Sequence, residues 1–359
     1  MATRFRLLFC VLCLSAVGPL QAQAADAPAK ADGSKKPVKI FILAGQSNMQ
    51  GKGSLDHLSQ LVKDEPAKFG HLKDKDGKWI ERDDVWISFP NIGGRDTDQK
   101  GRLSVGYTWP PKVKVGPELS FGEVVGNAID EPVLLVKAAW GGQSLDVDFR
   151  SPSAGWDRAF DIDNRDQWKP GSQGWAYKQI FNQLHIAVNL HMAEFPELKG
   201  RDYEVAGLVW FQGWNDLIDG KRIDAYEKNM VHFIRDIRKH LNRPNLPIVI
   251  GLMGQDGDKA AANMQKMRAA QAAPAAMEEF KGTVAAVPTA PYWDPTVKYD
   301  GGYHYLGSAR FYYDAGAAMG KAMLQLLDSA KPGKDAAPAA KTINSSATPV
   351  EIRNPDATK

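Results

Sequence analysis

The chain has 359 residues, of which 43% are hydrophobic, 24% are charged and 9% are aromatic. Its 45 Lys and Arg residues nearly balance its 42 Asp and Glu residues, and the formal net charge is +3. This balance argues against the strongly basic surfaces with which proteins bind nucleic acids or anionic membranes.

The amino-terminal 24 residues have the pattern of a secretory signal peptide. Two arginines precede the apolar run 7–17, and residues 22–24 have the A-x-A form of a cleavage site ending at Ala24. The run is shorter than the ~20 residues needed to span a bilayer, so we expect an exported protein, secreted or periplasmic, rather than a membrane protein. Both cysteines, Cys10 and Cys13, lie in this segment. The mature chain is therefore expected to contain no disulfide and no cysteine-based site.

Composition divides the rest of the chain into three parts. Residues 25–36 are expected to be a linker, residues 37–328 one globular domain, and residues 329–359 a disordered tail. Both terminal stretches are rich in Ala, Lys and Pro and lack aromatic residues. The central part is long enough for one large hydrophobic core.

Apolar runs alternate with helical patterns in the central part. The runs 38–43, 133–136, 205–211, 247–253 and 283–287 are short and bounded by polar residues or glycine, as buried parallel strands are. Residues 177–193, 224–241 and 308–327 have helical periodicity. This alternation predicts a three-layer α/β/α sandwich with a central parallel sheet of flavodoxin-like type. Segments 52–116 and 146–174 are rich in Gly, Pro, Trp and Asp, and we expect them to be long surface loops.

The first predicted strand delivers a serine, Ser47, in the sequence Gly45-Gln46-Ser47-Asn48-Met49. Ligands of open α/β sheets bind beyond the carboxyl ends of the strands, so Ser47 is well placed to be a nucleophile. A serine that caps the following helix would have the same position in the sequence.

A serine nucleophile requires a base, and His304 is the best placed of the seven histidines. Four others fall inside predicted helices, and two fall in the segment 52–116. His304 follows Asp300-Gly301-Gly302, so Asp300 could orient its imidazole as the third member of a triad. Asp-Gly-Gly is equally typical of an ordinary turn.

Two further strand ends could supply donors to an oxyanion. Gly141 and Gly142 follow the run 133–136 and allow a backbone N–H to approach a substrate. Gln212 and Asn215 follow the run 205–211 and carry side-chain amides. Each cluster by itself is also compatible with a plain turn before a helix.

Together these blocks resemble the SGNH (GDSL-like) hydrolase superfamily. The segment Gly45-Gln46-Ser47-Asn48-Met49 is similar to its carbohydrate esterase family 6 and sialate O-acetylesterase branch. So are three later segments, Gly116-Pro117-Glu118-Leu119-Ser120-Phe121, Ala139-Trp140-Gly141-Gly142 and Trp210-Phe211-Gln212-Gly213. The resemblance extends from about residue 39 to residue 324, nearly the whole of the predicted domain.

The resemblance implies roles for the residues that match. Ser47 would be the nucleophile and would donate its own N–H to the oxyanion, Gly141 or Gly142 would be the second donor, and His304 would be the base. The superfamily pattern selects Asn215 as third donor, whereas the branch pattern selects Gln212, and both remain open. The superfamily spacing Asp-x-x-His is one residue shorter than the spacing of Asp300 to His304, which leaves Asp294 as a second candidate for the acid.

These residues predict ester hydrolysis through an acyl-enzyme without a cofactor. No zinc-protease motif is present, and Asp161, Asp163 and Asp166 lack the spacing of a calcium loop, so no metal is expected. Many of the ten tryptophans lie in the predicted loops, where aromatic rings suit a sugar, although each could equally pack the core. We therefore expect an O-acetylated glycan as substrate. The alternatives are an esterase for a non-carbohydrate ester, such as a lipid or thioester, and a non-catalytic glycan-binding protein. The sequence contains no indication of the oligomeric state.

Overall fold

The computed structural model describes residues 35–90, 98–156 and 172–329. The predicted signal peptide, nearly all of the predicted linker, the tail and the acidic run of Asp161, Asp163 and Asp166 lie outside these residues. No helix in the described ranges is long and apolar enough to cross a bilayer.

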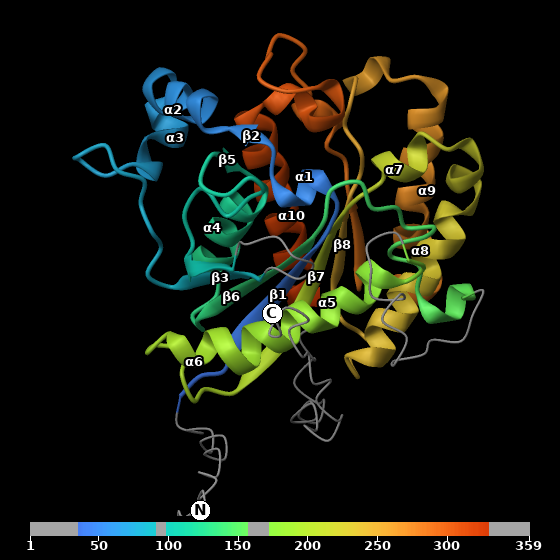
Figure 1. Cartoon of the computed structure of the whole chain (residues 1–359), viewed down its shortest axis with the longest axis horizontal. Helices are drawn as coiled ribbons and strands as arrows, with labels where there is room; N and C mark the ends of the chain where they lie inside the picture. Colours follow the sequence, from blue (N-terminus) through green and yellow to red (C-terminus); the bar gives the residue numbers. More distant parts are fainter. Residues whose placement is uncertain (1–34, 91–97, 157–171, 330–359) are drawn as a thin grey trace, which may run out of the picture.

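A seven-stranded sheet with the order β4-β3-β6-β1-β7-β8-β9 forms the centre of the domain (Figure 1). Its strands are β1 (Val38–Gly45), β3 (Val85–Phe89), β4 (Gln99–Arg102), β6 (Val133–Ala139), β7 (Tyr203–Phe211), β8 (Ile248–Gly251) and β9 (Val284–Val287). All neighbouring strands pair in parallel except β4, which runs antiparallel to β3 at one edge. The predicted parallel sheet is confirmed, with the addition of this antiparallel edge strand.

Helices cover both faces of the sheet, which confirms the three-layer α/β/α architecture (Figure 1). One face packs against α5 (Trp175–Ile186), α8 (Gly220–His240) and α9 (Ala262–Ala276), and the other packs against α4 (Glu118–Ala128) and α10 (Ala309–Ser329). Because side chains alternate along a strand, Ile40 and Ile42 of β1 join the first layer, whereas Phe41 and Leu43 join the second. All four side chains are fully or almost fully buried. This explains the continuous apolar run in the sequence.

Both predicted surface loops contribute buried residues to the fold, and the first also contains regular secondary structure. Segment 52–116 holds β3 and β4, the helices α2 (Leu55–Asp64) and α3 (Pro66–Phe69), and a small sheet of β2 (Gly53–Ser54) and β5 (Lys114–Val115). Every residue of β3 is buried, because this strand lies between β4 and β6. In segment 146–174, Phe149 is buried in the core. The strand β3 is only five residues long and includes a serine, so its apolar signal was too weak to separate it from the polar residues around it.

Three strands end side by side at the centre of the sheet. Gly45 of β1 pairs with Ala139 of β6 on one side and with Phe211 of β7 on the other. The chain builds β3 and β6 on one side of β1 and then β7, β8 and β9 on the other, so the strand order reverses around β1. Ligands of such sheets bind at this switch point. The short helices α1 (Ser47–Gln50) and α7 (Trp214–Leu217) follow two of these ends (Figure 1).

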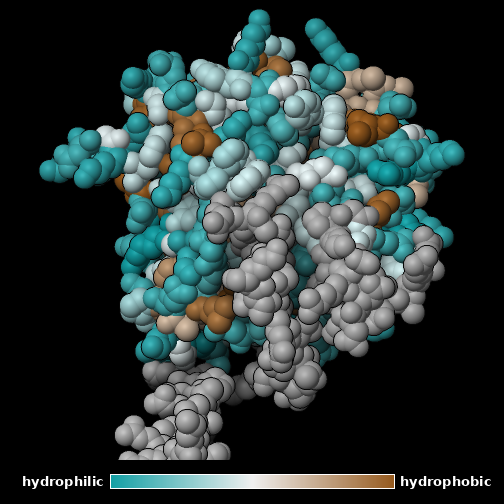
Figure 2. All heavy atoms as spheres, in the orientation of Figure 1, coloured by the Kyte–Doolittle hydropathy of each residue, from teal (hydrophilic) through white to brown (hydrophobic). Residues whose placement is uncertain are grey.

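The face of the molecule seen in Figure 2 is mostly hydrophilic. Its hydrophobic side chains form small separate patches rather than one large apolar surface. Scattered patches of this kind are ordinary for a globular domain.

Candidate active site

Ser47 is the first residue of α1, directly beyond the end of β1. Gln46 occupies the N-cap position, and its side chain does not cap the helix, so Ser47 is not a capping serine. The side chain of Ser47 keeps an exposed fraction of 9%, whereas its neighbours Gln46, Asn48 and Gln50 are between 2% and 5% exposed. The preceding Gly45 approaches β7 so closely that a Cβ atom there would lie 2.2 Å from the carbonyl oxygen of Phe211. Only glycine fits at this turn.

His304 lies in a tight loop before α10, residues 299–307, which we call the histidine loop. Tyr305, Leu306 and Gly307 follow His304 with φ values of 52°, 55° and 73°, three left-handed residues in succession. Two of them are not glycine, and such backbone strain is characteristic of functional sites. The carbonyl of Leu306 compensates by accepting the N–H groups of Tyr299 (2.7 Å) and Asp300 (3.0 Å). The loop is thereby closed around His304.

Asn48 joins the segment of Ser47 to the histidine loop. Its side-chain N–H donates to the carbonyl of Tyr303 at 3.1 Å, and its oxygen accepts the hydroxyl of Tyr312 at 2.6 Å. Asn48 directly follows Ser47 and Tyr303 directly precedes His304, so the serine and the imidazole are carried on segments that are bonded to each other. Within the described residues, no hydrogen bond joins the hydroxyl of Ser47 to His304 itself.

Asp300, rather than Asp294, lies beside the imidazole. The Oδ1 atom of Asp300 is 3.3 Å from Nδ1 of His304, although the N–H direction is not aligned for a hydrogen bond. The same oxygen accepts the N–H of Gly301, and Oδ2 accepts Lys114 Nζ at 2.8 Å. Asp294 instead accepts the N–H and hydroxyl of Thr296 two residues along the chain.

The electrostatic environment keeps His304 neutral and Asp300 ionised at neutral pH. Burial is the main cause that lowers the pKa of His304, Lys52 and Lys114 lower it further, and the Asp300 carboxylate partly opposes them. Burial alone would raise the pKa of Asp300, but the hydrogen bonds from Lys114 and Gly301 and the nearby His304 outweigh it and lower that pKa. A neutral imidazole beside a carboxylate can accept a proton from a hydroxyl.

Gly141, the first of the two glycines after β6, faces the serine. We call residues 140–148 the glycine loop. A Cβ atom built on Gly141 would lie 3.8 Å from Cβ of Ser47. Among the described residues, neither Gly141 nor Gly142 donates its N–H to another group. These N–H groups are therefore available to a ligand near Ser47.

The two candidate amides after β7 differ in how many of their donors are engaged. Both N–H bonds of the Gln212 side chain are used, one to the carbonyl of Gln143 at 3.0 Å and one to Asp216 at 2.6 Å. The Asn215 amide donates to the carbonyl of Gly142 at 2.7 Å and accepts from Gln46 at 3.1 Å, which leaves one of its N–H bonds without a partner. Gln212 is 2% exposed, whereas Asn215 is only half-buried.

The sequence interpretation missed several residues that organise this site. Asn48, Lys114 and Asp216 all contact candidate site residues or their loops. Asn48 and Asp216 stand inside the motifs already identified, so their position was a usable signal. Lys114 lies 186 residues before Asp300, and nothing in the sequence pairs them. Within the described residues, no three His, Cys, Asp or Glu side chains come together in an arrangement that could hold a metal ion.

A second Ser-His-Asp contact occurs away from the switch point. Ser88 of β3 contacts Nδ1 of His191 at 2.8 Å, and Nε2 of His191 lies 3.0 Å from Asp98. Ser88 has an exposed fraction of 0% and His191 one of 2%, so no ester can reach the hydroxyl. His191, one of the four histidines that fall inside predicted helices, is a hydrogen-bonded core residue.

The tryptophans divide between core and site. Trp86, Trp175 and Trp210 are at most 2% exposed and pack in the core. Trp214 is half-buried, and its ring centre lies 5.9 Å from that of Tyr303, whose ring in turn lies 4.3 Å from the His304 imidazole. Tyr303 is 47% exposed. Of these tryptophans, Trp214 therefore lies near the candidate site, whereas the other three pack in the core. Tyr303 is an aromatic neighbour of the site that the sequence interpretation did not single out.

Comparisons with known proteins identify the family and the fold of the chain. Residues 37–290 match the family model described as carbohydrate esterase, sialic acid-specific acetylesterase. A probable carbohydrate esterase of Arabidopsis thaliana, At4g34215, is 26% identical over 230 residues, which cover 59% of this chain and 68% of the relative. Two solved structures share the fold. The match to XAC1771, a carbohydrate acetylesterase from Xanthomonas citri, has 16% identity and a TM-score of 0.51 and covers 81% of this chain and 56% of XAC1771. The match to NanS has 13% identity and a TM-score of 0.51 and covers 83% of this chain and 99% of NanS.

Proposed function

Because the chain belongs to the sialic acid-specific acetylesterase family of carbohydrate esterases, we propose that it removes O-acetyl groups from a glycan through an acyl-enzyme on Ser47. Membership of the family makes the chain an O-acetylesterase, a carboxylic ester hydrolase. The observation that carries the assignment of Ser47 and His304 is the Asn48 hydrogen bond to the Tyr303 carbonyl, since it joins the segments of the two residues.

His304 acts as the base in this mechanism. Its lowered pKa keeps the imidazole unprotonated at neutral pH, so it can take the proton of Ser47 as the hydroxyl attacks the ester carbonyl. Asp300 stabilises the imidazolium that forms. His304 then gives the proton to the leaving sugar hydroxyl, and water repeats the two steps to release acetate. Catalytic hydrogen bonds are often long or unaligned without substrate, and we expect the Ser47 to His304 bond to form when the ester binds.

The oxyanion is proposed to rest on three donors. They are the N–H of Ser47, which has no carbonyl partner within α1, the N–H of Gly141 and the free amide N–H of Asn215. Gln212 is a poorer candidate because both of its N–H bonds are already engaged inside the protein. An Asn215→Ala variant is expected to lower kcat by roughly 10²-fold, the effect of losing one oxyanion donor.

We propose that the sugar lies against Trp214 and Tyr303. The two rings are neighbours and Tyr303 contacts the imidazole edge-on, so a ring stacked there would place its ester near His304. XAC1771 is described as a carbohydrate acetylesterase and At4g34215 as a probable carbohydrate esterase, which supports a sugar ester over a lipid or thioester. Both sialate-type and xylan-type glycans remain within the proposal. Export to the periplasm or the medium, with cleavage near Ala24, is proposed from the amino-terminal pattern.

Acetate release from O-acetylated sialic acid, acetylated xylan and short and long acyl esters tests the proposal. We expect hydrolysis of acetyl esters in preference to long-chain esters, and a loss of roughly 10³-fold or more in Ser47→Ala with glycan binding retained. The matched control is Ser88→Ala, which alters the buried Ser-His-Asp contact and is expected to leave the rate unchanged. Preference for long-chain esters would favour a lipid substrate. Glycan binding without acid release from the wild-type protein would show a non-catalytic binding protein.

A further inference from the structure

Asp216 is a buried carboxylate that forms no ion pair with a Lys or Arg of the described residues. It has an exposed fraction of 0%, and three N–H groups donate to it. Its Oδ2 accepts the Leu145 N–H at 2.8 Å and the Gln212 amide at 2.6 Å, and its Oδ1 accepts the Asp146 N–H at 3.0 Å. Burying an ionised group in this way is unfavourable unless hydrogen bonds compensate for the lost water. Desolvation of this carboxylate therefore lowers the stability of the fold, and the carboxylate lies next to the candidate active site.

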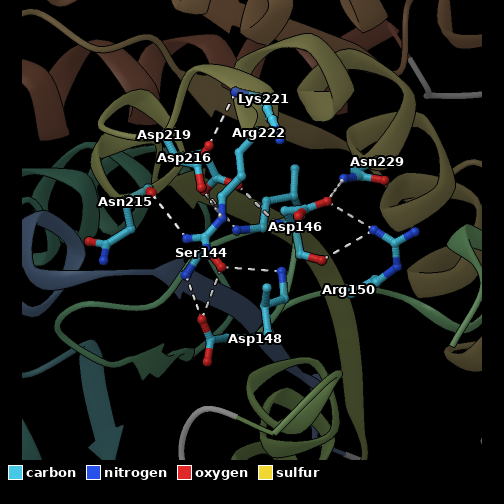
Figure 3. Close-up of polar contacts among 12 residues, drawn as sticks. Ser144, Asp146, Asp148, Arg150, Asn215, Asp216, Asp219, Lys221, Arg222 and Asn229 are labelled. Atoms are coloured by element: carbon cyan, nitrogen blue, oxygen red, sulfur yellow. Dashed lines mark hydrogen bonds and ion pairs between the residues drawn. The ribbon is translucent and has the colours of Figure 1, made fainter. Parts of the chain in front are cut away.

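The three donors come from two different strand ends. Leu145 and Asp146 belong to the glycine loop after β6, and Gln212 directly follows β7. A further bond joins the same two segments, because the Gln212 amide also donates to the carbonyl of Gln143 in the glycine loop. Asn215 makes the third link, through its bond to the Gly142 carbonyl. Figure 3 shows Asp216 between Ser144 and Asp146 on one side and Asn215 on the other.

We propose that Asp216 is the positioning residue of the oxyanion site, because its carboxylate holds the glycine loop and the Asn215 turn in one fixed arrangement. This inference rests on the proposed function and deepens it. Asp216 touches neither Ser47 nor His304, so it acts through the backbone that carries Gly141 and Asn215. Donors to an oxyanion must be placed to within a fraction of an ångström, and a shift of 1 Å can cost about 10² in rate.

Only an ionised carboxylate accepts from all three donors. An asparagine at the same position has one acceptor oxygen, and its NH₂ group would face at least one N–H that donates to Asp216. A protonated Asp216 has the same defect, since its O–H would face a donor. Asp216→Asn is therefore a nearly isosteric change that removes part of the link without leaving a cavity or a buried charge.

Burial raises the pKa of Asp216 to about 6, against the three donors that lower it, and the Asp146 carboxylate adds to the rise. The other charged or titratable groups around it are Asp148 and Arg150 on the glycine loop segment, Asp219 and Arg222 at the start of α8, and Tyr226 on α8. Because the folded protein binds this proton more tightly than the unfolded chain, ionised Asp216 lowers stability above pH 6. Asp216→Asn removes that cost, so the variant is expected to fold.

The matched control is Asp148→Asn. Asp148 is also buried and accepts two bonds within the glycine loop, from the N–H and hydroxyl of Ser144, and burial also raises its pKa. In the described part of the chain, the Asp148 side chain makes no hydrogen bond to Gln212, Gly213 or Asn215. A general loosening of the glycine loop would affect both variants, whereas loss of the link between the strand ends would affect Asp216→Asn alone.

The test is kcat and KM of the two variants for an acetyl ester between pH 4.5 and 9. We expect Asp216→Asn to lower kcat about tenfold to hundredfold at pH 8 with KM changed less than about threefold, as for misplaced transition-state donors. In the wild type, a plot of log kcat against pH should have a limiting slope near 2 on the acid side, because His304 and Asp216 must both be deprotonated. The slope should be near 1 in Asp216→Asn and remain near 2 in Asp148→Asn. An Asp216→Asn enzyme with wild-type kcat, or with a slope near 2, would overturn the proposal.

Amide hydrogen exchange separates this inference from the proposed function. Leu145 and Asp146 N–H groups should exchange faster in Asp216→Asn than in the wild type, whether or not the protein hydrolyses an ester. If the wild type and Ser47→Ala both fail to release acetate, the proposed function fails while exchange still reports the link. If exchange at these two amides is unchanged, the positioning role is wrong even in an active esterase.

Discussion

Replacing Lys137 by methionine is expected to destabilise the domain strongly. Lys137 belongs to β6, has an exposed fraction of 0% and makes three hydrogen bonds through its ammonium group. It donates to Glu118 at 2.9 Å, to the carbonyl of Gln50 at 2.9 Å and to the carbonyl of Tyr107 at 2.7 Å. Glu118 is also 0% exposed and has no other cationic partner among the described residues. Every ammonium hydrogen is thus used in the wild type.

The expected loss of stability comes from the buried carboxylate that the substitution leaves without its partner. Lys137→Met leaves the carboxylate of Glu118 buried and unpaired, and removing one partner of a buried ion pair costs roughly 3–5 kcal/mol. Burial already raises the pKa of Glu118, so that carboxyl is expected to take up a proton in the variant. The double variant Lys137→Met, Glu118→Gln contains no unpaired charge, and we expect it to recover about 2 kcal/mol of the loss.

Urea denaturation measures both effects. With a slope of about 3 kcal/mol per molar urea, the single variant should unfold about 1 M or more below the wild type. The matched control is Lys39→Met, which breaks the partly exposed pair with Glu204 and should cost about 1 kcal/mol or less. Equal midpoints for Lys137→Met and Lys39→Met would refute the reasoning. So would a double variant that is no more stable than the single one. Because Gln50 ends the helix that begins with Ser47, activity should fall in parallel.

Two further predictions concern the turn before Ser47 and the acid of the triad. Gly45→Ala is expected to lower the free energy of unfolding by roughly 1–3 kcal/mol or more and to lower activity, because the added Cβ would lie 2.2 Å from the Phe211 carbonyl oxygen. Urea denaturation measures the first effect and acetate release the second. Wild-type values in both assays would contradict the close approach of Gly45 to β7. Lys114→Met is expected to raise the pKa of His304, because a cation that lowers it disappears and Asp300 loses a competing partner. Since the base must be neutral, the acid-side midpoint of kcat/KM should move to higher pH, and an unchanged or lower midpoint would contradict this role of Lys114.

Lys39→Met is also the control for the Lys114 variant. Lys39 lies near the start of β1, at the opposite end of the strand from Ser47. It likewise pairs with a single carboxylate, Glu204, so the same substitution there removes a comparable ion pair. Its kcat/KM profile should match that of the wild type at every pH.

The sequence alone predicted the architecture and the candidate site residues at the strand ends. Five buried strands were predicted because strands covered on both faces need apolar side chains at nearly every position, as in the run before Ser47. The site motifs were visible for a related reason. Ser47, Gly141 and Asn215 directly follow such strands, and parallel strands place their carboxyl ends at one edge of the sheet.

The same reasoning missed a buried strand whose sequence is not a long continuous apolar run. The strand β3 is fully buried but short, and polar residues precede it, so segment 52–116 was interpreted as a loop. The strand is buried because it pairs with β4 on one side and with β6 on the other. Of these two partners, β6 is distant in the sequence. Local composition cannot reveal such a pairing.

Only the tertiary structure decided among residues of equal chemical type. Asp300 and Asp294 are both carboxylates before His304, and the direction of their side chains places one beside the imidazole and the other in its own turn. Gln212 and Asn215 are both amides, and they differ in how many N–H bonds the fold already uses. Residue type determines which hydrogen bonds a side chain can make. Which of them it makes depends on distances between segments far apart in the chain, and these exist only once the sheet has formed.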